Sequence, residues 1–167
     1  QDTLYTGLRV GLFALCLMIA VLGGRVTPGF TRNAMKRADV PENALPQSRK
    51  ALDLAAIALI ALASVSLLLG LPDAVTATLA IIGGAAQILR IAYWAPLWAV
   101  TQPILWALHL GMAMLGAGMV LWGFSGFGWG SEVAALHVLG IGAVGGMTLA
   151  VMSKMMSMMH PPNDTRG

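Results

Sequence analysis

Two histidines, His109 and His137, are almost the only ionisable residues placed well inside the long apolar runs of this 167-residue chain. An imidazole changes charge near neutral pH and is also the commonest side-chain ligand of metals. A polar ring inside a membrane needs a partner, which is either a hydrogen-bonding group on a neighbouring helix or a metal. Both histidines are therefore candidate cofactor ligands, and hydrogen bonding between helices is the alternative for each.

A third group of candidate ligands lies near the end of the chain, in a stretch rich in thioethers that ends in an imidazole. Thioether and imidazole are soft ligands that suit Cu(I), although methionine is also an ordinary filler of apolar space. We expect this stretch to lie on the same membrane face as His109. A copper site built from His109, His160 and a methionine such as Met159 is therefore geometrically allowed, with His137 as a further candidate metal ligand. The stretch comprises Met152, Met155, Met156, Met158, Met159 and His160.

Arg90 and Trp106 are candidates to bind a cofactor beside these ligands. Arg90 lies late in an apolar run, where its guanidinium would serve as the counter-charge of a haem propionate or another anion. The alternative is that its side chain reaches out to the membrane surface, as long basic side chains near helix ends do. Trp106 precedes His109 by three residues, so the two share one face of a helix.

The elements that must position these residues are transmembrane helices. The chain is 57% hydrophobic and only 10% charged, which lies outside the usual range of soluble domains. Each apolar run is close to the ~20 residues that cross the hydrocarbon as a helix. The sequence predicts an all-α, polytopic transmembrane bundle that forms a single domain over residues 1–167, with a polar loop at 25–50. The expected spans are 8–24, 51–71, 74–94, 102–122 and 133–152.

The basic residues indicate how the bundle is oriented. Nine of the ten fall on one predicted membrane face, together with the loop 25–50 and the C-terminus, and only Arg9 lies towards the other. By the positive-inside rule that face is cytoplasmic. The basic residues flank apolar spans and are not interleaved with aromatic side chains, which argues against a nucleic-acid partner. The nine are Arg25, Arg32, Lys36, Arg37, Arg49, Lys50, Arg90, Lys154 and Arg166.

The same topology separates the two histidines in depth. The fourth and fifth spans run antiparallel, so His109 and His137 should differ in depth by about 10 Å or more. This offset argues against a simple pair of axial haem ligands. His109 lies on the basic side with Arg90 and is the stronger candidate, whereas His137 is interpreted as a separate site or a packing residue. Glycines within the spans either allow close helix packing or leave room for a flat macrocycle.

Residues 23–33, which read GGRVTPGFTRN, resemble the NnrS family of bacterial membrane proteins, in which a G-G-R-x-x-P-x-F-T-R-N run follows a span. The segments around His109 and His137 also resemble that family. The residues carried over by the resemblance are Arg25, Pro28, Thr31, Arg32 and Asn33 in the run, with Trp106, His109 and His137 in the later spans. The resemblance covers nearly the whole chain but only the C-terminal portion of the family's usual length.

This resemblance implies a haem- and copper-containing protein of the bacterial cytoplasmic membrane, linked to nitric oxide metabolism and resistance to nitrosative stress. The haem is expected to be of the b type, and nitric oxide is the expected ligand. Further transmembrane spans or another membrane subunit are the expected partners, because the chain resembles part of a larger protein.

Two other functions are open at this point. A scaffold or accessory subunit would use its histidines only to hydrogen-bond neighbouring helices. An electron-transfer protein with b-type haem would need two histidines at matching depth. The single cysteine, Cys16, excludes a disulfide framework within the chain, and the sequence contains no nucleophile triad that would predict a particular reaction.

Overall fold

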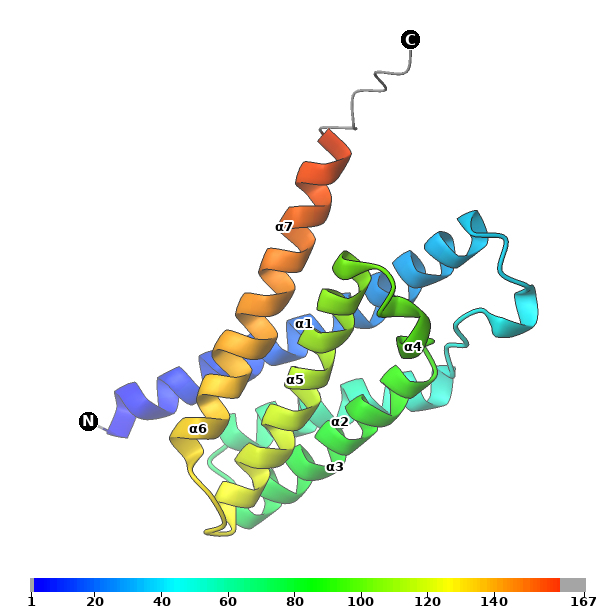
Figure 1. Ribbon diagram of the computed structural model, residues 1–167. Coiled ribbons are helices and arrows are strands. Elements are labelled where there is room, and N and C mark those ends of the chain that lie inside the picture. The colour runs from blue at the N-terminus through cyan, green and yellow to red at the C-terminus, as the bar shows by residue number, and fades with distance from the viewer. Residues whose placement is uncertain (1, 160–167) are drawn as a thin grey trace.

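The computed structural model describes residues 2–159, and their side chains except those of residues 2, 3, 150, 151, 153, 154 and 157–159. The described chain consists of helices and short connections, with no strand among these residues (Figure 1). The elements in chain order are α1 (Asp2–Arg37), η1 (Glu42–Ala44), α2 (Lys50–Leu68), α3 (Asp73–Ala92), α4 (Pro96–Ala99), α5 (Pro103–Gly126), α6 (Glu132–His137), η2 (Val138–Gly145) and α7 (Gly146–Met159).

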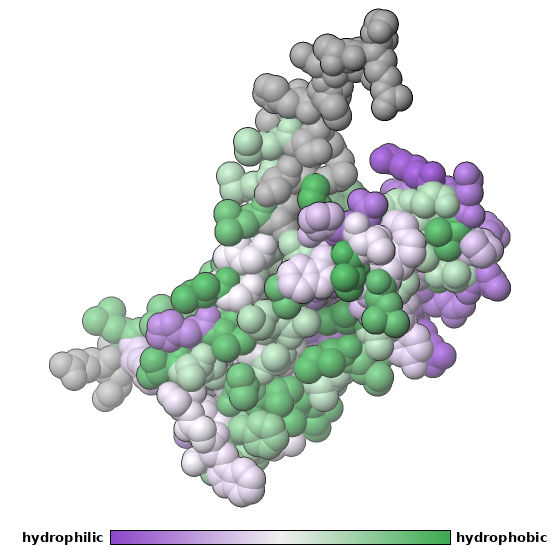
Figure 2. Space-filling model, viewed as in Figure 1, coloured by the Kyte–Doolittle hydropathy of each residue, from purple (hydrophilic) through white to green (hydrophobic). Residues whose placement is uncertain are grey.

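Within residues 2–159, five helical segments are long and apolar enough to cross a membrane. They leave many large apolar side chains exposed, such as Leu8, Leu54 and Leu62, as expected where lipid rather than water surrounds a bundle. Hydrophilic side chains gather at the end of the molecule where α1 finishes and the chain turns towards α2 (Figure 2). The all-α fold with about five spans is thereby confirmed. The segments are Leu4–Arg37, Lys50–Leu68, Asp73–Ala92, Pro103–Gly126 and Glu132–Leu149.

Helix α5 is the centre of the bundle, because it packs against α1, α3, α6, η2 and α7. Glycines bring α3 and α5 close together. A Cβ added at Gly116 would lie 2.9 Å from the carbonyl oxygen of Gly84, and one at Gly123 would lie 2.7 Å from that of Ala77. Since lipid provides no hydrophobic drive between helices, such close backbone contacts are what hold the pair together.

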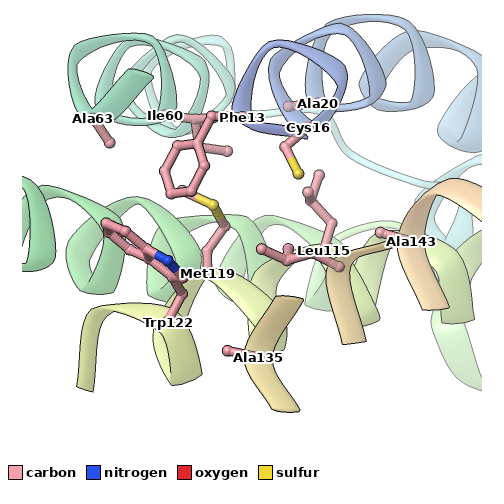
Figure 3. Close-up of a cluster of buried hydrophobic side chains, with 12 residues drawn as sticks. Phe13, Cys16, Ala20, Ile60, Ala63, Leu115, Met119, Trp122, Ala135 and Ala143 are labelled. Atoms are coloured by element: carbon pink, nitrogen blue, oxygen red, sulfur yellow. The ribbon is translucent and has the colours of Figure 1, made fainter. Parts of the chain in front are cut away.

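Two clusters of buried side chains form the core. The first joins α1, α2 and α5 to the α6–η2 segment around Phe13, Ile60, Leu115 and Met119 (Figure 3). The Phe13 ring meets the edge of Trp122 with their centroids 4.7 Å apart, an arrangement that the aromatic quadrupole favours. The second cluster lies around Trp94, Leu108, Met112 and Met147.

The first helix differs from the prediction of a polar loop over residues 25–50. Helix α1 continues through Pro28 to Arg37, so the loop proper begins only after that residue. Thirty-six residues of helix span ~54 Å, which is longer than the ~30 Å hydrocarbon core. The basic second half of α1 therefore extends beyond the apolar region, and the proline and charges that indicated a loop instead mark this extension.

The fifth span also differs from a plain helix. It contains a π-helical stretch, η2, at Val138–Gly145, between α6 and α7. Three glycines fall in this stretch, Gly140, Gly142 and Gly145, and glycine is conformationally permissive. π-helical turns are frequent at functional sites, and this one begins directly after His137.

Candidate functional site

His137 ends α6 with its side chain exposed. Its Nδ1 lies 2.7 Å from the carbonyl oxygen of Val133, one helical turn earlier. A carbonyl oxygen only accepts, so Nδ1 is the nitrogen that donates here, and in the neutral ring Nε2 is the nitrogen without a proton. The lone pair of Nε2 is then left available, which is the state in which an imidazole binds a metal.

A groove of about 780 Å³ runs beside His137, between α1 and the α6–η2 segment. Figure 1 shows these two segments crossing. The walls of the groove are apolar apart from Tyr5 and His137. Three lining glycines, Gly7, Gly11 and Gly140, have no atom within 4 Å of the place a Cβ would occupy. The groove is therefore open, and its volume lies within the ~300–1,000 Å³ typical of cofactor sites. The other lining residues are Leu8, Leu12, Leu15, Val133, Leu136 and Ile141.

A polar clamp fixes one end of this groove. The carboxylate of Glu132 accepts hydrogen bonds from Arg9 at 2.5 Å, Tyr5 at 2.9 Å and the Trp122 indole at 3.1 Å. Hydrogen bonds to an ionised acceptor are stronger than neutral ones. Because the donors come from α1 and α5, the clamp sets the position of α6 and of His137 relative to the groove.

His109 has a different environment, enclosed between α5 and the segment after α3. Its ring is only 5% exposed. The Nδ1 atom lies 2.9 Å from the carbonyl oxygen of Leu105, and Nε2 lies 3.3 Å from that of Trp94. A neutral imidazole donates only one hydrogen bond at a time, and the Trp94 ring stands edge-on to it at 6.3 Å. A flat macrocycle at His109 would have to displace this packing, whereas the His137 ring is exposed beside an open groove.

Arg90 turns into the bundle. Its side chain is 1% exposed, its Nη2 donates a hydrogen bond to the Ala20 carbonyl at 2.8 Å, and its guanidinium lies 5.0 Å from the centre of the Trp94 ring. Gly24 provides the space on α1, because a Cβ there would lie 1.8 Å from Nη2. The alternative that Arg90 reaches out to the membrane surface does not describe this arrangement.

Arg90 and Asp53 include buried polar atoms without a hydrogen-bond partner among the described residues: Nε and Nη1 of Arg90 and Oδ1 of Asp53. The Asp53 carboxylate lies 3.9 Å from the Arg90 Nε and offsets its charge. This mixture of donors and acceptors suits water better than an anion, and a propionate would have to compete with Asp53.

The five residues carried over from the family run at 23–33 lie in different environments on α1. Thr31 is fully buried and donates to the Thr27 carbonyl at 2.8 Å, while Arg25 and Arg32 are exposed and Pro28 is half-buried. Asn33 lines a cavity of about 430 Å³ between the end of α1 and the start of α5. None of these five residues lines the His137 groove.

The family model described as NnrS protein matches residues 1–163 of the chain. The chain belongs to the NnrS family. No curated protein matches it, and no solved structure does. Family membership confirms the resemblance found in the sequence, and together with the five apolar helices it makes this chain an NnrS-family multi-pass membrane protein.

Of the predicted metal ligands, His109 and His137 are those whose side chains the structure describes, and they lie in different environments. Over residues 2–159, no three His, Cys, Asp or Glu side chains lie close enough to hold a metal ion. His160 lies outside the described residues, as does the side chain of Met159. Trp106 is 45% exposed, so it does not enclose a buried site around His109.

Sequence reasoning missed the residues of this NnrS-family protein that face His137 from α1. Gly7 and Gly11 are four residues apart and therefore share one helical face. That spacing in the first span was the available signal, but the sequence did not indicate that the face would meet the fifth span. The pairing of Arg9 with Glu132 was also missed, although each is a lone charge at the predicted edge of its span.

Proposed function

We propose that this NnrS-family protein binds haem in the groove between α1 and α6–η2, with Nε2 of His137 as the ligand of the iron. The single observation that carries the proposal is an exposed imidazole, oriented by the Val133 carbonyl, beside an open apolar groove. A metal-binding histidine usually donates its other ring N–H to a carbonyl or carboxylate in this way.

The chemistry of the groove suits a flat apolar macrocycle. The glycines at positions 7, 11 and 140 leave its floor without side chains, and the remaining walls are aliphatic apart from Tyr5. When bound, haem would supply an iron that takes nitric oxide, and the surrounding apolar wall would limit access of water. The protein's own part is to orient the His137 ring through the Val133 carbonyl and to keep α1 and α6 apart.

We further propose a role in nitric oxide metabolism or resistance at the bacterial cytoplasmic membrane. Nitric oxide is small and apolar and enters lipid, so a site on a lipid-facing groove meets it without a dedicated channel. The charge asymmetry of the sequence supports an orientation with residues 25–50 and the C-terminus on the cytoplasmic side. Hydrophilic side chains gather where α1 finishes and the chain turns towards α2 (Figure 2).

The test is a visible spectrum of the full-length protein purified in detergent, recorded with and without nitric oxide, together with its iron content. We expect a haem Soret band that nitric oxide shifts. The His137→Ala variant should lose this band, whereas the matched His109→Ala variant should retain it. A colourless, iron-free wild type, or a band that survives in His137→Ala and disappears in His109→Ala, would contradict the assignment. Because His137 is exposed, its variant should elute as wild type on size exclusion.

Copper is part of the same proposal, as the second metal implied by the family. Its support among the described residues comes from the thioethers of Met18, Met147 and Met152, which line one cavity. Cu(I) accepts thioether ligands readily.

A further inference from the structure

Methionines from three helices, α1, α5 and α7, meet around the stretch of α1 that includes Met18 and Gly23. A cavity of about 270 Å³ lies between α1 and the span formed by η2 and α7. Three of its eight lining residues are methionines: Met18 from α1, and Met147 and Met152 from α7. A fourth, Met112 of α5, approaches the same point from the core.

Two of these side chains converge on the backbone of Gly23. A Cβ added at Gly23 would lie 2.5 Å from the Met112 sulfur and 2.6 Å from the Met147 methyl group. A Cβ added at Gly111 would lie 3.0 Å from the Met147 sulfur. The absence of a side chain at both glycines thus leaves a space that the two thioethers share.

The four methionines differ in how far they are buried. Met112 is fully buried and Met147 is 6% exposed, whereas Met18 and Met152 are 52% and 56% exposed. The Met112 sulfur also lies 3.9 Å from Nε2 of Gln87, which holds it in place. Met147 is therefore the buried thioether that lines the cavity, Met112 lies behind Gly23 in the core, and Met18 and Met152 are the accessible thioethers of the lining.

We propose that Met112 and Met147, together with Met18, bind a Cu(I) ion at this cavity. Uncharged thioethers bind soft monovalent ions such as Cu(I) and not hard divalent cations. An apolar site inside a bundle also favours an ion of low charge, because removal from water costs more for higher charge. The proposal rests on the proposed function in naming copper as the metal, and it does not depend on haem at His137.

The competing explanation is that the methionines only fill irregular space. Leucine separates the two explanations, because replacing Met by Leu conserves volume and apolarity and removes the sulfur. The matched control is Met119→Leu, since Met119 is also fully buried but belongs to the other core cluster. A second control is the Met155→Leu/Met156→Leu variant, which removes two exposed thioethers of α7 outside the cavity.

The experiment titrates full-length protein in detergent with Cu(I), without oxygen and against a coloured Cu(I) chelator. We expect the Met112→Leu/Met147→Leu variant to lose about one equivalent of chelator-resistant copper per chain. Both controls should bind as wild type. Equal copper in the double variant and wild type would overturn the proposal, as would loss confined to Met155→Leu/Met156→Leu.

X-ray absorption of the copper-loaded wild type provides a test that does not depend on folding of a variant. We expect a shell of sulfur neighbours at the copper and no nitrogen neighbour. A nitrogen shell would assign the metal to histidine and would also overturn the proposal. The copper measurement is distinct from the visible spectrum, so a colourless protein that binds Cu(I) refutes the haem assignment alone, and a coloured protein without copper refutes this one.

Discussion

Replacing Gly24 by alanine tests whether α1 is shaped around the buried guanidinium of Arg90. The added methyl group would lie 1.8 Å from Nη2 and 2.9 Å from Cζ of Arg90. Such overlap requires movement. The end of an arginine side chain is flexible, but this one is 1% exposed and packs on Trp94, so it has no solvent into which it can move. We therefore expect either the guanidinium or α1 to shift.

The expected loss in the free energy of unfolding follows from the hydrogen bond of Arg90 that this shift removes. The hydrogen bond from Nη2 to the Ala20 carbonyl is 2.8 Å long, and a bond from a charged donor contributes ~1.5–3 kcal/mol. Alanine in place of glycine within a helix contributes a gain of up to ~1 kcal/mol. The expected net loss is thus about 0.5–2 kcal/mol in the free energy of unfolding.

Gly29→Ala is the matched control, because Gly29 lies on the same helix and has no atom within 4 Å of the added methyl group. It should be neutral or stabilising. Both variants are measured by thermal unfolding in detergent, alone and in an Arg90→Met background. With Arg90 removed, the penalty of Gly24→Ala should disappear, and a double-mutant cycle reports the coupling between the two sites. Equal stability of Gly24→Ala and Gly29→Ala, or a coupling of zero, would refute the reasoning.

Two further predictions concern the groove. Glu132→Gln removes the charge that Arg9, Tyr5 and Trp122 share, and since both carboxylate and guanidinium are 23% exposed, we expect a loss of only ~1 kcal/mol in unfolding free energy. Thermal unfolding of Glu132→Gln, compared with Glu42→Gln in the exposed η1 turn, checks this, and equal stability would show that the clamp is unimportant. Gly11→Leu places a side chain in the open groove, so it should lower haem retention several-fold without a loss of stability, whereas Gly29→Leu should not. The Soret absorbance per chain decides between them, and unchanged haem in Gly11→Leu would place the cofactor elsewhere.

The spans could be predicted from the sequence because they depend on local hydrophobicity, but the length of α1 could not. Pro28 cannot donate the helical hydrogen bond to the Gly24 carbonyl, and basic residues follow it, so a loop was the natural interpretation. The helix persists to Arg37 because Thr31 and Met35 continue the buried face of α1. Such packing between distant segments is not visible in a single sequence.

The different environments of the two histidines were equally inaccessible to periodicity. His109 and His137 are both flanked by apolar residues, and their difference lies in helix rotation. One ring faces Trp94 in the core, and the other faces an open groove. The space at Gly24 for Arg90 likewise depends on how α1 lies against α3, which the sequence does not indicate.

The two proposed metal sites share α1 as a common wall but are separated along it. Gly11 faces the His137 groove, and Gly23 faces Met112 and Met147. Twelve residues of helix place these glycines ~18 Å apart. The fifth span forms the opposite wall of both sites, and η2 lies in it between His137 and Met147. Because a π-helical turn is wider than an α-helical one, η2 rotates the direction in which α7 side chains point relative to those of α6. One continuous span can therefore present the His137 imidazole to its groove and the Met147 thioether to the core. Mutations at one site should then change binding of its own metal and leave metal binding at the other site unchanged.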